Sequence, residues 1–170
     1  MENITFNLFM IMSIPDNLLL FCLGLGLAGI KLPPFRELIA AAVVNALFSF
    51  AVRSMPLAPG AHLIFQVPFI ILSLIFICKI PAVYSTIAAF LGLIFLFIIQ
   101  AFMSFLITGV TGISFSTFLS TPKLHLALSI PSLLACLLFV LIINKWEVVL
   151  LDLQALMEKG KDEGLQSEKN

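Results

Sequence analysis

The chain has 170 residues, of which 61% are hydrophobic and only 11% are charged, whereas soluble domains carry roughly 25% charged residues. Nine basic and nine acidic residues cancel to zero net charge, and no basic patch indicates a nucleic-acid partner. This composition excludes an ordinary soluble domain. It predicts an all-α protein, a polytopic helix bundle whose solvent is the lipid bilayer.

Five apolar runs follow one another, each close to the 20 or so residues that a helical span requires. Because a backbone in lipid must satisfy its own hydrogen bonds, we expect these runs to be helices. Prolines, glycines and lysines bound the predicted spans, which are residues 6–30, 35–55, 62–80, 82–109 and 125–144. Residues 113–124 are expected to form a loop or a short interfacial helix.

Proline leaves the first run open to two interpretations. It is a single retained span, or Pro15 splits it and raises the number of elements to six. An acidic start at Glu2 and the absence of Lys or Arg before Lys31 argue against a signal peptide. We expect Pro15, Pro68 and Pro131 to lie in first helical turns, where proline is tolerated, since deeper positions would kink the helices.

Basic residues predict the orientation, because short cytoplasmic loops are enriched in Lys and Arg. With the N-terminus outside, Arg53 and Lys123 fall outside, and the inside holds Lys31, Arg36, Lys79, Lys145, Lys159, Lys161 and Lys169. We therefore expect a multi-pass protein of the cell membrane with its C-terminus inside. Residues 1–146 would form the transmembrane bundle, and residues 147–170 a short cytoplasmic tail that begins amphipathic and ends disordered.

Polar side chains within the predicted spans gather in the outer half of the membrane when depth is estimated from the helical rise of about 1.5 Å per residue. Asp16 is the acid placed deep in a span, and Arg53 is the base at a matching depth, so we expect them to pair or to line one cavity. The candidates for a ligand cavity or an interhelical polar network are Asp16, Asn17, Asn45, Ser49, Arg53, His62, Gln66, Gln100 and Ser104.

The spacing of these residues supports shared helix faces. Asn45, Ser49 and Arg53 recur every four residues, as do Gln100 and Ser104. An alternative remains open, in which the polar stripes only hold helices together by interhelical hydrogen bonds and Arg53 extends to the outer interface.

Small residues and the lack of catalytic motifs complete the pattern. Gly24, Gly26 and Gly29 would let another helix approach the first span closely, and small-residue faces permit a homodimer.

Residues for catalysis or metal binding are few. His62 and His125 are far apart, the three cysteines form no pair motif, and a single deep acid offers little for acid–base chemistry. We therefore expect no enzyme activity, no metal and no cofactor.

Several short segments resemble a known family. The segments at 13–19 (SIPDNLL), 27–31, 53–57 and 60–62, and those at 111–115 and 121–124, look like the N-terminal multi-span sensor region of bacterial sensor histidine kinases of the accessory-gene-regulator type. The resemblance covers roughly residues 13–146 and implies a role in signal transduction. No phosphoacceptor histidine or ATP-binding box follows the last run, so we expect a non-catalytic sensor or regulatory module that signals through a partner kinase or another membrane protein.

Two other classes of function remain open. One is the substrate-binding membrane subunit of a vitamin or metal transporter, which would have six spans and dock on a coupling subunit. The other is a membrane assembly or structural factor that acts through helix packing alone.

Overall fold

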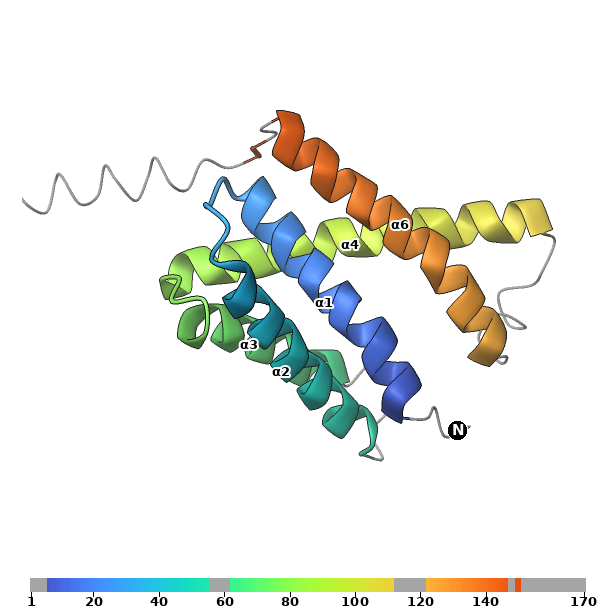
Figure 1. The fold of residues 1–170 in the computed structure, drawn as a ribbon, viewed down its shortest axis with the longest axis horizontal. Helices are drawn as coiled ribbons and strands as arrows, with labels where there is room; N and C mark the ends of the chain where they lie inside the picture. The colour runs from blue at the N-terminus through green and yellow to red at the C-terminus, as the bar shows by residue number, and fades with distance from the viewer. Residues whose placement is uncertain (1–5, 56–61, 112–121, 147–148, 151–170) are drawn as a thin grey trace, which may run out of the picture.

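A computed structural model describes residues 6–55, 62–111, 122–146 and 149–150, and within these ranges the chain is all-helical. Its helices are α1 (Phe6–Leu27), α2 (Phe35–Arg53), α3 (His62–Phe76), α4 (Ala82–Thr111) and α6 (Pro122–Trp146) (Figure 1). The all-α class is thus confirmed, and each of the five predicted runs overlaps one helix, although α4 and α6 extend two or three residues beyond the predicted bounds. The expected loop or interfacial helix at 113–124 lies largely outside the described residues, as does most of the tail at 147–170.

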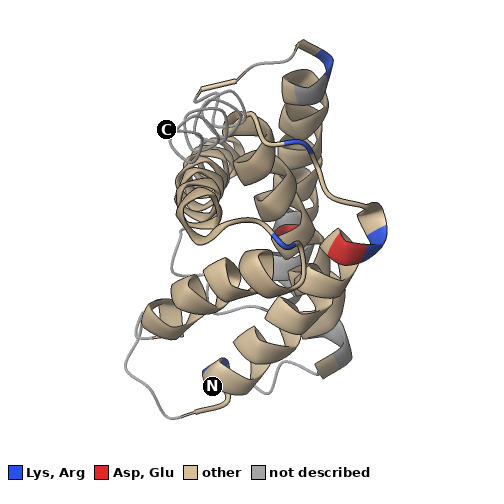
Figure 2. Ribbon diagram, turned by 90° about the vertical axis from the view of Figure 1, so that its left-hand side faces the viewer, with Lys and Arg blue, Asp and Glu red and all other residues tan. Residues whose placement is uncertain are grey.

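Three of the helices are long and apolar enough to cross a membrane, over Phe9–Leu27, Phe35–Arg53 and Ala82–Val110. Two shorter apolar helical segments accompany them, His62–Phe76 and Ile130–Ile143. Figure 2 shows that charged residues lie mainly at helix ends and connections, and Asp16 of α1 is an exception within a helix body. This distribution fits a membrane protein, because an uncharged helix body can face lipid without desolvating a charge.

The prediction that three prolines occupy first helical turns is wrong. Pro15, Pro68 and Pro131 lie inside α1, α3 and α6, well beyond the first turn. Helix α1 runs through Pro15 as one continuous element, so the proline does not divide the first run. An internal proline removes one backbone hydrogen bond, and tertiary packing decides whether the helix continues past it.

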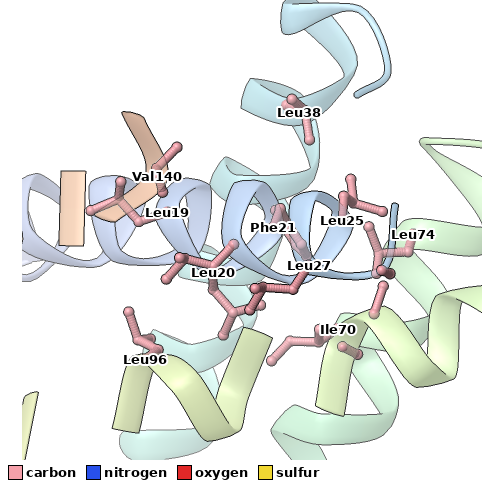
Figure 3. Packing of buried hydrophobic residues seen from close by; sticks show 14 of the residues in the cluster. Leu19, Leu20, Phe21, Leu25, Leu27, Leu38, Ile70, Leu74, Leu96 and Val140 are labelled. Carbon is pink, nitrogen blue, oxygen red and sulfur yellow. The ribbon is translucent and has the colours of Figure 1, made fainter. Parts of the chain in front are cut away.

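Helix α1 occupies the centre of the bundle, in contact with α2, α4 and α6, while α3 packs against α2 and α4. The apolar core forms around it (Figure 3). Phe21, Leu23 and Leu25 of α1 are almost completely buried, and they belong to one cluster with residues of every other helix. The core members that Figure 3 labels outside α1 are Leu38, Ile70, Leu74, Leu96 and Val140.

Small residues allow α1 and α4 to cross backbone to backbone. A Cβ atom added at Gly24 would overlap the carbonyl group of Ala88, and one added at Gly92 would lie 2.5 Å from the carbonyl oxygen of Leu20. On the α6 side, a Cβ at Gly26 would lie 3.2 Å from Ile143. The expected close approach at Gly24 is therefore confirmed.

The C-terminal end of α1 is closed by a glycine and is contacted by Leu150, which follows α6. Gly29 has φ 64°, and the N–H groups of Gly29 and Ile30 donate to the carbonyls of Gly26 and Leu25, the pattern of a Schellman cap. The backbone N–H of Leu150, which follows α6, donates to the carbonyl of Leu27 at 2.9 Å. The segment after α6 therefore begins against the end of α1.

Candidate functional site

Aromatic side chains join the N-terminal half of α1 to the C-terminal half of α2. Phe6 and Phe9 of α1 both contact the ring of Phe50, at centroid distances of 4.9 and 5.4 Å. The guanidinium of Arg53, one turn after Phe50, lies 5.3 Å from the centroid of the Phe9 ring. Such a cation–π contact holds a guanidinium over an aromatic face without neutralising its charge.

The charged candidates meet at this end of the bundle. Asp16 and Arg53 lie close enough to interact electrostatically across α1 and α2, and His62 at the start of α3 interacts with Arg53 in the same way. Cys136 of α6 also lies within electrostatic range of Asp16. Asp16 and His62 are half-buried, whereas Arg53 is exposed. Three helices, α1, α2 and α3, therefore contribute to what we call the Asp16–Arg53 cluster, defined as Asp16, Arg53, His62 and Phe9.

Below Arg53 the same face of α2 is polar and buried. Asn45 and Ser49 have 0% and 2% of their surface exposed. The Asn45 amide nitrogen donates to the carbonyl of Ala41 at 3.0 Å, but its Oδ1 is buried without a partner among the described residues. Asn17 on α1 is buried as well, and its amide nitrogen donates to the carbonyl of Ser13 at 2.7 Å.

Hydrogen bonds of these buried side chains thus stay within their own helices. The same holds for Ser73, whose hydroxyl donates to Phe69, and for Thr108, whose hydroxyl donates to Ser104. In lipid, a side chain that bonds its own backbone needs no second helix. The contacts that bring α1 and α4 together are instead the close approaches at glycine.

The remaining candidates lie on α3 and α4. Gln66 is half-buried on α3, one turn after His62. Gln100 and Ser104 lie along the C-terminal half of α4, where they line a hollow of about 500 Å³. The described residues that line this hollow are Phe97, Gln100, Ala101, Ser104, Phe105 and Thr108, all from α4, so the hollow is separate from the Asp16–Arg53 cluster.

Sequence reasoning missed the aromatic part of the cluster. In the sequence, Phe9 of the cluster and its neighbour Phe50 stand out only as apolar residues of predicted spans, although Phe50 precedes Arg53 by three positions and must share its helix face. Ser132 of α6 is not among the predicted candidates, yet its hydroxyl oxygen is buried without a partner among the described residues. No sequence pattern could place Cys136 near Asp16, because the two are joined only by the packing of α6 on α1.

Chemically, the cluster offers an exposed guanidinium with a carboxyl group and an imidazole beside it. An exposed guanidinium presents several N–H donors to an anion, and a neighbouring carboxyl group competes with that anion for the same donors. Within the described ranges no group of three His, Cys, Asp or Glu residues is placed to hold a metal ion.

No family model, no curated protein and no solved structure matches this chain. The resemblance to sensor-kinase membrane regions therefore stays a prediction. What the chain does has to be argued from its own residues and their arrangement.

Proposed function

We propose that the chain is a non-catalytic integral membrane sensor, and that the Asp16–Arg53 cluster is the part that responds to an external ligand. The observation that carries the proposal is the exposed guanidinium of Arg53, held over Phe9 and within electrostatic range of Asp16 on a different helix. A ligand that engages Arg53 changes the balance between α1 and α2, because it competes with Asp16 for the same charge.

The position of the cluster supports an outward-facing site. Glu37 of α2 and Cys78, which follows α3, interact electrostatically, so Arg36 and Lys79 lie at one end of the bundle. Lys31 belongs to the same end, because it stands between α1 and the start of α2. Arg53 lies at the opposite end of α2. Under the positive-inside rule the end with three basic residues is cytoplasmic, which leaves Arg53 facing outward.

Helix α1 supplies a path from the cluster to the other side of the membrane. Asp16 and Leu27 belong to this one continuous helix, about 16 Å apart along its axis. The carbonyl of Leu27 accepts the hydrogen bond from Leu150, so a shift of α1 reaches the start of the C-terminal segment directly. In this proposal that segment, residues 147–170, contacts a signalling partner such as a kinase.

A comparison of partners and activity tests the proposal. The full chain with a C-terminal tag is purified under mild detergent from its native membranes, and the proteins that co-purify are identified by mass spectrometry. A histidine kinase is then reconstituted with the chain in nanodiscs, and its autophosphorylation is measured for wild type, Arg53→Gln and the matched control Arg36→Gln. We expect Arg53→Gln to alter kinase activity and Arg36→Gln to behave as wild type.

Other outcomes replace the proposal. Co-purifying ATPase subunits with a held vitamin or metal would make the chain the binding subunit of a transporter. Purification without any signalling protein, or equal kinase activity for both arginine variants, would leave a membrane assembly factor as the remaining reading.

A further inference from the structure

The C-terminal half of α4 carries polar side chains on a surface that the described helices leave open. The residues of this surface, which we call the Gln100 face, are those that line the hollow of about 500 Å³, namely Phe97, Gln100, Ala101, Ser104, Phe105 and Thr108. Phe97 and Phe105 on its two sides are 70% and 79% exposed. In Figure 1 the yellow C-terminal end of α4 extends beyond the other helices.

Gln100 lies within the apolar stretch of α4 that is long enough to cross a membrane. The apolar stretch Ala82–Val110 is long enough to cross a membrane, and Gln100 lies about 27 Å along the axis from its start and about 15 Å from its end. In a hydrocarbon layer of about 30 Å centred on this stretch, Gln100 would lie about 6 Å from the middle, where water does not reach it. Within the described part of the chain, the carboxamide of Gln100 makes no hydrogen bond.

An unbonded carboxamide in hydrocarbon favours any neighbour that can bond with it, and polar side chains on lipid-facing helices associate for this reason. No charged residue occurs in α4 from Ala82 to Thr111, so this helix offers no charge to attract a charged partner. The neighbour must therefore supply neutral donors and acceptors, together with apolar bulk that fills the hollow.

We propose that the Gln100 face binds a second copy of this chain. Two copies inserted with the same orientation relate by a two-fold axis along the membrane normal, so their α4 helices run parallel and each residue meets its own counterpart at the same depth. Gln100 suits this constraint, because a carboxamide both donates and accepts and can pair with an identical group. The hydroxyl of Ser104 has the same property one turn further along.

The geometry of the face fits such a contact. Ala101 gives the hollow a low floor between Phe97 and Phe105, and small residues at a helix interface let two backbones approach. The bulky rings on either side then enclose the two carboxamides and separate them from lipid. This interface does not rest on the Asp16–Arg53 cluster, and it would form whether or not the chain is a sensor.

Disulfide cross-linking in intact membranes tests which face meets the second copy. In the full chain with Cys22, Cys78 and Cys136 replaced by alanine, Ser104→Cys places a thiol on the Gln100 face. Leu106→Cys is the matched control, since Leu106 is 44% exposed at nearly the same depth but points to another side of α4. Oxidation is expected to give a dimer with Ser104→Cys and not with Leu106→Cys.

A dilution series in liposomes tests the role of the carboxamide and needs no cysteine replacement. The full chain with a C-terminal fluorescent tag is diluted in lipid, and dimers are counted by photobleaching steps. Gln100→Leu is expected to weaken dimerisation between about threefold and tenfold, the range typical of an interhelical polar contact in lipid. Gln66→Leu, the same change on α3, is expected to leave it unchanged.

The proposal is overturned by any of three results. These are a chain that stays monomeric at every dilution, Gln100→Leu association equal to wild type, or a Leu106→Cys dimer as abundant as the Ser104→Cys dimer. Cross-linking of Ser104→Cys to a different protein in native membranes would likewise assign the face to another partner.

Discussion

Helix α1 and the C-terminal half of α4 are both apolar, yet the bundle treats them differently. In α1, 44% of the residues in the membrane-length stretch are buried within the protein, whereas in α4 the share is 11%. Helix α1 meets three other helices and carries glycines at its crossings, while α4 beyond Ile99 presents exposed phenylalanines such as Phe102 and Phe105. Apolar character alone therefore does not decide which helix faces protein and which faces lipid.

Close packing is the physical source of the difference. Lipid tails are as apolar as leucine, so burial in protein is favoured over burial in lipid only where surfaces fit closely. Gly24 and Gly92 provide that fit at the α1–α4 crossing. No comparable pair of small residues brings a described helix against the outer side of α4 near Phe105, and that side stays open.

The difference in packing between α1 and the C-terminal half of α4 is tested most directly by replacing one glycine in each helix with alanine, which adds one methyl group. In Gly24→Ala, the new Cβ overlaps the Ala88 carbonyl, a backbone group that cannot rotate away, so the free energy of unfolding is expected to fall by about 3 kcal/mol. Gly109→Ala is the matched control, because a Cβ there meets nothing within 4 Å. Alanine at this position is expected to leave stability equal or to raise it by up to about 1 kcal/mol, since it favours helix.

Unfolding in mixed detergent micelles, followed by circular dichroism, measures both variants. Equal stability of Gly24→Ala and Gly109→Ala would mean that the α1–α4 crossing is looser than the structure has it.

Neutralising Asp16 or Arg53 tests how strongly the N-terminal half of α1 is held to α2. Arg53→Gln leaves the half-buried Asp16 without its partner charge and is expected to lower the free energy of unfolding by about 1.5 kcal/mol. Asp16→Asn leaves only the exposed Arg53, which water solvates, and is expected to lower it by at most about 1 kcal/mol. The double variant is expected to lose less than the sum of the two, because the second change removes the charge that the first left unpaired.

The four proteins are compared by the same unfolding measurement, with Arg36→Gln as a control at the opposite end of α2. Strict additivity, or stability of both single variants equal to wild type, would show that Asp16 and Arg53 act independently.

Replacing the carboxamide residues Asn45 and Gln100 by leucine is expected to give the smallest changes in the free energy of unfolding. Asn45 is completely buried and its Oδ1 has no partner among the described residues, so Asn45→Leu is expected to raise the free energy of unfolding by about 1 kcal/mol. Gln100→Leu, on the open side of α4, is expected to leave unfolding of the monomer within about 0.5 kcal/mol of wild type.

A loss of stability in Asn45→Leu would contradict this expectation. It would show that Oδ1 has a bonded partner, such as a water molecule, in the folded protein, and would place a polar site between α1 and α2.

Much of the architecture could be predicted because lipid imposes a simple rule on sequence. A run of about 20 apolar residues must become a helix in a bilayer, so the start of α2 at Phe35 and of α4 at Ala82 followed from the prolines that precede them. The close approach at Gly24 also followed from the sequence, since only a residue without a side chain lets another helix come so near. The predicted positions of the prolines were wrong, because a local preference for first helical turns contains no information about the tertiary packing that lets α1 continue past Pro15.

By itself the sequence determined the helical class, the approximate bounds of each helix and the choice of Asp16 and Arg53 as residues to watch, since these depend on hydrophobicity and charge along a single chain. Only the tertiary structure decided that Arg53 lies over Phe9, that Cys136 approaches Asp16, and that Gln100 and Ser104 line a hollow apart from that cluster. Such contacts depend on the angle and rotation at which helices cross. Helix-to-helix packing sets both, and no periodicity within one helix contains them.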